Sequence, residues 1–139
     1  MALHVLVVED DAVCGESLRR MIDRFRPDAA ITLVSAAEDA LSFLPGVHAV
    51  ITDHRLAGAM TGDQLRVAAE ARGLPVLLIS GVGVVSHSGN AAVVEKGNRE
   101  DLLCAVCNLL DQFQGIRRVR TTARRLAHLT VLEAVGLVS

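Results

Sequence analysis

The stretch LHVLVVEDD, residues 3–11, decides the fold class, because a strand-length apolar run ends there in three acids. Three later apolar runs also end in a polar group: residues 49–52 precede Asp53, residues 76–79 precede Ser80, and residues 91–95 precede Lys96. In a parallel α/β sheet the carboxyl ends of all strands lie at one edge, which is where ligands bind. The four polar ends are therefore expected to meet in space.

Strand and helix patterns alternate along the chain, which predicts a parallel sheet with helices on both faces. Strands are predicted at residues 3–8, 30–34, 49–52, 75–79 and 91–95. Helices are predicted at residues 13–25, 35–44, 61–73 and 98–113, with capping boxes at Ser35-Ala36-Ala37-Glu38 and Thr61-Gly62-Asp63-Gln64. The last helix would bury Leu102, Leu103, Val106, Leu109, Leu110 and Phe113. The prediction is a flavodoxin-like, doubly wound α/β domain with a five-stranded parallel sheet over residues 1–114.

The connection between the fourth and fifth strands is unusually short. Only residues 81–90 join them, and a parallel crossover usually needs a dozen or more residues. Three of the ten residues are glycines, which disfavour a helix. We expect the fourth helix to be shortened or replaced by a loop.

Composition fits a globular protein of 139 residues, with 51% hydrophobic and 22% charged residues and a net charge of −2. The first apolar run is too short for a signal peptide or a membrane span, so a cytoplasmic protein without membrane contact is expected. Three cysteines argue against a disulfide framework. Cys104 and Cys107 fall mid-helix and are expected to be buried in its apolar stripe.

Residues 115–139 form a basic tail with five arginines and one glutamate: Arg117, Arg118, Arg120, Arg124 and Arg125 against Glu133. A helix over residues 123–135 would carry a leucine stripe, which favours packing on the body or a homodimer through these helices. The arginines also suit nucleic acid. Aromatic residues are only 2% of the chain, however, and the tail is too short for a DNA-reading domain, so nucleic acid is the less favoured partner.

The acids at the ends of the first and third predicted strands would repel one another if they lie close together, and a bound divalent cation would keep them ionised. Mg²⁺ suits one or two carboxylates together with waters and a phosphate oxygen. Asp11 lies past the strand end and is expected to cap the first helix. A lysine and a hydroxyl beside the acids could hold the other oxygens of a phosphate.

The segments VLVVEDD, TDHRLAGAMTGDQL, LLISG and VVEK together resemble the receiver domain of two-component response regulators, and the resemblance covers residues 3–113. It implies that Asp53 accepts a phosphoryl group from a histidine kinase or a phosphotransfer protein. It also implies a Mg²⁺ site at Glu9, Asp10, Asp53 and the Arg55 carbonyl, and phosphate binding by Ser80, Gly81 and Lys96. Such a domain is a signalling module rather than an enzyme, and its output is a protein contact.

The sequence departs from the receiver pattern at three positions. Val93 stands where receivers usually have a tyrosine or phenylalanine, Gly97 replaces a proline, and Ala57 replaces another proline. Two alternatives therefore stay open. One is a pseudo-receiver that binds partners without phosphate, and the other is the receiver part of a truncated transcription regulator.

Overall fold

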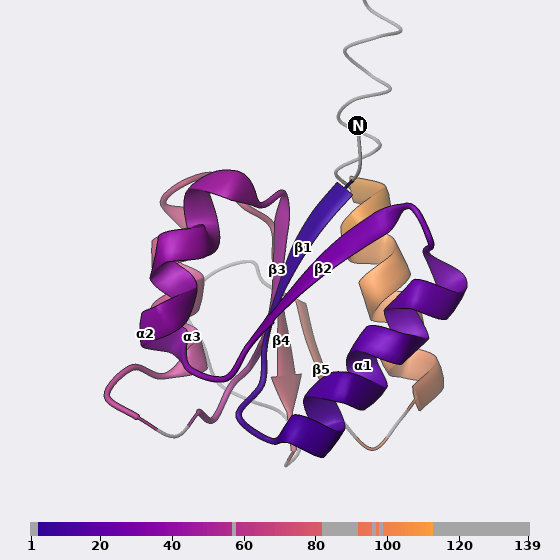
Figure 1. The fold of residues 1–139 in the computed structure, drawn as a ribbon, viewed down its shortest axis with the longest axis horizontal. Helices are drawn as coiled ribbons and strands as arrows, with labels where there is room; N and C mark the ends of the chain where they lie inside the picture. Colours follow the sequence, from indigo (N-terminus) through magenta and orange to yellow (C-terminus); the bar gives the residue numbers. More distant parts are fainter. Residues whose placement is uncertain (1–2, 57, 82–91, 96, 98, 113–139) are drawn as a thin grey trace, which may run out of the picture.

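The computed structural model describes residues 3–56, 58–81, 92–95, 97 and 99–112. Five strands form one parallel sheet in the order β2-β1-β3-β4-β5 (Figure 1). Their bounds are β1 Leu3–Val8, β2 Ala29–Val34, β3 Ala49–Asp53, β4 Val76–Ser80 and β5 Ala92–Glu95. The predicted doubly wound α/β fold is confirmed, and all five strand predictions agree with the structure to within one residue at each end.

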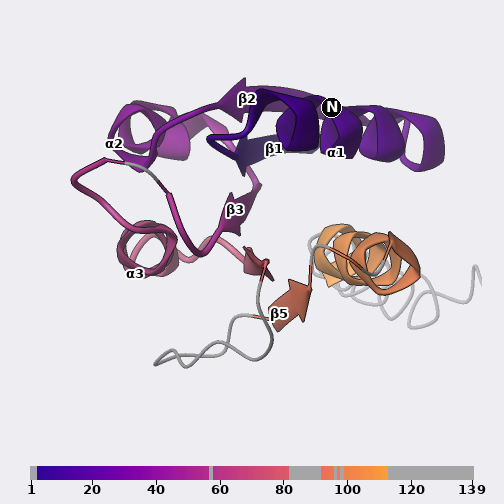
Figure 2. The same ribbon diagram turned by 90° about the horizontal axis from the view of Figure 1, so that it is seen from below.

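Helices cover both faces of the sheet. They are α1 Ala12–Phe25, α2 Ala37–Ala40, the 3₁₀ helix η1 Leu41–Gly46, α3 Gly62–Glu70, and a further helix over residues 99–112. Figure 2 shows α2 and α3 on one side of the sheet and α1 with the helix over 99–112 on the other. None of the helices described in the structure has the length and apolarity needed to cross a membrane.

The two sides of the sheet form separate hydrophobic cores, because alternate residues of a strand point to opposite faces. Val5 and Val7 of β1 face the core shared with α1 and the helix over 99–112, whereas Leu6 and Val8 face the core shared with α2 and α3. Leu102, Val106, Leu109 and Leu110 are buried as predicted, and Leu103 is half-buried.

Two of the helix starts follow the sequence signals. The side chain of Asp11 caps α1 by accepting hydrogen bonds from the N–H groups of Val13 and Cys14. Thr61 and Gln64 form a reciprocal capping box at the start of α3.

The second helix was predicted wrongly in two respects. No side chain caps α2, whose N-cap residue is Ala36, so the capping box expected from Ser35 does not form. After four residues the chain tightens into η1, which continues through Pro45, the residue expected to stop the helix. The Glu38 carboxylate expected in that box instead contacts the loop after β3.

The cysteine prediction is also wrong. Cys104 is exposed and Cys107 is half-buried. Both lie beside the apolar stripe of the helix over 99–112 rather than within it, because the i, i+3 and i+4 positions that face the sheet are occupied by leucine and valine. The connection predicted to be short, Asn98, Phe113 and the basic tail all lie outside the described residues, apart from Gly81.

Candidate functional site

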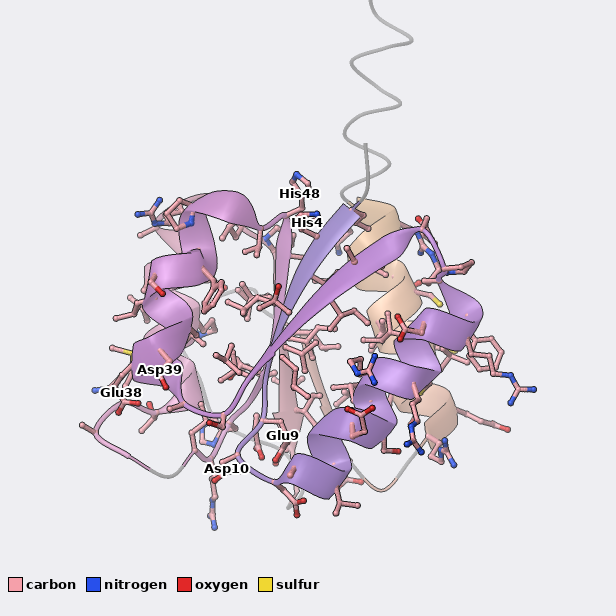
Figure 3. The ribbon with its side chains drawn as sticks, viewed as in Figure 1. His4, Glu9, Asp10, Glu38, Asp39 and His48 are labelled. Carbon is pink, nitrogen blue, oxygen red and sulfur yellow. The ribbon has the colours of Figure 1, made fainter. Side chains whose placement is uncertain are left out.

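Three carboxylates gather at the carboxyl edge of the sheet. Glu9, Asp10 and Asp53 each place a side-chain oxygen within 4.8 Å of the others. Glu9 and Asp53 are buried, with 4% and 6% of their surfaces exposed, whereas Asp10 is exposed. In Figure 3, Glu9 and Asp10 lie at the lower edge of the sheet, the end toward which its strands run. The structure therefore confirms the prediction that these three acids lie close together.

Parallel pairing explains why residues that are far apart in sequence meet here. Val8 pairs with Thr52, so the next residues, Glu9 and Asp53, leave the two strands at the same level. Neighbouring parallel strands lie about 4.8 Å apart, which is the spacing required to bring two carboxylates together. Asp10 lies one residue further along the chain, at the rim.

Backbone N–H groups orient the two buried carboxylates. The N–H of Asp11 donates to Oε1 of Glu9 at 3.1 Å, and the N–H of Arg55 donates to Oδ1 of Asp53 at 3.1 Å. Arg55 itself is exposed. Each acid thus receives a hydrogen bond from the residue two positions later, which fixes its direction at the strand end.

Helix α3 begins in close contact with the end of β3. A Cβ atom at Gly62 would lie 1.8 Å from the carbonyl oxygen of Asp53, and the N–H of Gly62 donates to the carbonyl oxygen of His54 at 3.1 Å. Only a residue without a side chain allows this approach. Sequence reasoning assigned Gly62 to the capping box and did not find this contact.

The loop between β3 and α3 is tied to α2. Glu38 accepts a hydrogen bond from the N–H of Met60 at 2.7 Å through Oε1. The N–H of Glu38 itself, and then those of Met60 and Ala59, hold the pKa of Glu38 below its ordinary value. Figure 3 shows Glu38 at the lower end of α2, at the same end of the molecule as Glu9 and Asp10. Twenty-two residues separate the two partners, so no local pattern could have revealed the contact.

Of the predicted phosphate-binding residues, the structure places Ser80 on a neighbouring strand and Gly81 directly after it. Ser80 is the last residue of β4, is 3% exposed, and pairs in register with Glu95 of β5. Gly81 follows at the surface. Lys96 lies outside the described residues, directly after Glu95. Val93, at the position where receivers usually have an aromatic ring, is half-buried and pairs with Leu78.

The donor set fits a magnesium ion. Carboxylate oxygens are ligands that Mg²⁺ prefers, and it keeps several waters when only one or two carboxylates bind it directly. The exposed position of Asp10 and the buried positions of Glu9 and Asp53 leave the open side of the group toward solvent.

The sequence matches no protein-family model and no curated protein. Solved structures do match. The receiver domain of a putative Luxo repressor protein from Vibrio parahaemolyticus superposes with a TM-score of 0.73 at 20% identity, over 86% of this chain and 98% of that one.

Two further matches are similar. The N-terminal domain of a response regulator/sensory box/GGDEF protein from Carboxydothermus hydrogenoformans gives a TM-score of 0.71 at 20% identity, over 81% of this chain and 97% of that chain. A response regulator receiver protein from Sinorhizobium medicae gives 0.67 at 22% identity, with coverages of 81% and 97%. The chain therefore has the fold of a response-regulator receiver domain.

Proposed function

We propose that this protein is a signalling receiver that accepts a phosphoryl group on Asp53 from a histidine kinase or a phosphotransfer protein. The observation that supports the proposal most strongly is the group of three carboxylates within 4.8 Å at the carboxyl edge of the sheet. Asp53 is the member that comes from the central strand of the sheet, and it is the residue that matches the phosphoacceptor in the sequence resemblance.

Phosphoryl transfer requires mainly that the Asp53 carboxylate be correctly positioned. Its ionised carboxylate oxygen bonds to phosphorus while the bond from phosphorus to the donor's imidazole nitrogen breaks, and the electron pair stays on that nitrogen. Phosphoryl transfer depends mainly on alignment and charge neutralisation. The N–H of Arg55 orients Asp53, and the hydroxyl of Ser80 and the ammonium of Lys96 would bind phosphoryl oxygens.

Mg²⁺ is the cation that we assign to Glu9, Asp10, Asp53 and the Arg55 carbonyl. When bound it would neutralise charge on the carboxylates and on the incoming phosphoryl group. Without it, three like charges would surround the attacking oxygen and oppose the approach of an anion. We therefore expect phosphorylation to require the metal.

A groove beside α1 offers a surface for the phosphoryl donor. It is lined by apolar Val13, Met21 and Phe25 and by arginines that include Arg20 and Arg24. Val13 is 79% exposed and follows the site residue Asp10 by three positions, so a protein bound there would reach the site. The output is proposed to be a protein contact, with the tail at 115–139 available for a homodimer.

The test is intact mass after incubation with acetyl phosphate and Mg²⁺. The parent should gain one phosphoryl group, Asp53→Asn should gain none, and Asp10→Asn should gain it only at higher Mg²⁺. A chain truncated after Gln114 should still be labelled, since every site residue lies upstream. Labelling of Asp53→Asn equal to that of the parent would exclude Asp53 as the acceptor.

The second candidate is a pseudo-receiver that binds partners without phosphate. It is favoured by Val93, which leaves the fifth strand without the aromatic ring by which receivers usually transmit phosphorylation. The same mass experiment separates the two candidates. A parent protein that is never labelled, even at high acetyl phosphate and Mg²⁺, would favour the pseudo-receiver.

A further inference from the structure

We infer that Glu38 is a positioning residue for Asp53, acting through residues 58–62 of the segment that joins β3 to α3. The inference rests on the proposed phosphorylation of Asp53 and adds a residue from outside the acidic cluster to it. Glu38 lies on α2, whereas the loop joins β3 to α3, so the contact couples two separate segments of the chain.

Two residues of the loop, Met60 and Gly58, lie close to the Glu38 carboxylate. Oε1 of Glu38 accepts a hydrogen bond from the N–H of Met60 at 2.7 Å, a short distance for a bond from nitrogen to oxygen. Gly58 has a φ of +119°, and a Cβ atom there would lie 2.9 Å from the same oxygen. The loop therefore presents an N–H group and a side-chain-free residue to one carboxylate.

The loop reaches Asp53 from both of its ends. Near its start, the N–H of Arg55 donates to the Asp53 carboxylate. At its far end, Gly62 lies against the Asp53 carbonyl oxygen and hydrogen-bonds to His54. A carboxylate that fixes residues 58–60 therefore restrains the contact at Gly62, which lies two residues further along the chain.

The loop is held in place by a polar contact with Glu38 and by apolar packing. The side chains of Leu56 and Met60 pack against the core beneath α2 and α3. Packing sets the depth of the loop, but it is not directional. The hydrogen bond from Met60 to Glu38 is directional, and together with the N–H of Ala59 it can fix the orientation of the peptide planes between residues 58 and 60.

Asp39 provides a matched control. It neighbours Glu38 on α2, carries the same charge, and is exposed. Its hydrogen bond to Ser42 uses the main-chain oxygen, so a change of its side chain leaves that bond in place. Asp39→Ala therefore removes a carboxylate from the same helix without touching the loop.

The experiment compares the rate of phosphorylation by acetyl phosphate, at saturating Mg²⁺, with amide exchange at Met60 and with the thermal midpoint. Glu38→Ala should slow labelling about tenfold, less than the roughly 100-fold that a full 1 Å misplacement of a reacting group can cost. It should also speed exchange of the Met60 amide. Glu38→Gln, which keeps an acceptor oxygen, should restore most of the rate, and Asp39→Ala should behave as the parent.

Each outcome decides the inference. If Glu38→Ala accelerates Met60 exchange or lowers the thermal midpoint but labels at the parent rate, the carboxylate is structural and the inference is wrong. If Glu38→Ala does not fold, Glu38→Asp, which keeps the charge and shortens the reach, should show the slower labelling, and a parent-like rate overturns the inference. Failure of the proposed function is seen separately, as undiminished labelling of Asp53→Asn.

Discussion

Gly62→Ala tests the close contact between the start of α3 and the end of β3. The new Cβ atom would lie 1.8 Å from the carbonyl oxygen of Asp53, 2.8 Å from its carbonyl carbon and 3.0 Å from Cα of His54. All three are backbone atoms, so no side-chain rotation can relieve the overlap. The helix start and the strand end must separate by roughly 1 Å or more.

Two opposing effects set the magnitude. Alanine is favoured over glycine inside a helix by about 1 kcal/mol. Overpacking costs about 1–3 kcal/mol, and a collision with backbone that is held by the β3–β4 pairing belongs at the upper end of that range. The net loss of unfolding free energy is therefore about 2 kcal/mol, which is roughly 8 °C in the melting temperature of a domain of this size.

Thermal unfolding followed by circular dichroism measures the loss. Gly46→Ala is the matched control, because a Cβ atom there meets nothing within 4 Å and its φ is not positive. It should change the melting temperature little. Phosphorylation of the Gly62→Ala variant should also be slower, since the overlap displaces the backbone of Asp53. A variant that melts at or above the parent temperature would refute the reasoning.

Four further predictions concern single side chains. Asp10→Asn should raise the melting temperature in the absence of divalent cations, since it removes one of three like charges within 4.8 Å, and added Mg²⁺ should cancel the gain. Asp11→Ala should cost about 1 kcal/mol in urea unfolding, because it removes the cap of α1. Asp63→Asn should cost about 1 kcal/mol by the same measurement, because Arg66 loses one charged partner at 2.7 Å but keeps Glu70 at the same distance. The lowered pKa of Glu38 means that its carboxylate stabilises the fold fully above the ordinary value of 4.5 and loses this effect as the pH falls through the lowered value. The stability difference between the parent and Glu38→Gln should accordingly shrink below pH 4.5.

Much of the acidic site could be predicted because its information is local. Each strand is a short apolar run, and the polar residue that ends it occupies a position fixed by parallel pairing. Glu9 and Asp53 could be placed side by side from these two facts alone. The caps of α1 and α3 were also predictable, since a cap joins residues only two or three positions apart.

The supporting contacts could not be predicted, because they depend on tertiary packing. Glu38 has a sequence context that fits a capping box, yet its carboxylate bonds to Met60 of another segment. The sequence pattern places Gly62 at a helix start, where other residues are also allowed. Only the three-dimensional structure shows that the end of β3 lies too close for a side chain at this position. Cys104 was misplaced because an i, i+3 pattern does not distinguish the centre of an apolar stripe from its border.

Because the interior is divided into two cores, the effects of substitutions on the free energy of unfolding depend on which core each substitution touches. Leu18 of α1 belongs to one core and Leu44 of η1 to the other, and the sheet separates the residues that each contacts. Substitutions at distant sites without shared neighbours usually add. Substitutions on the surface of α1, where we propose that the phosphoryl donor docks, are therefore expected to add independently to the effects of substitutions on the α2–α3 side, where the loop beside Asp53 is anchored.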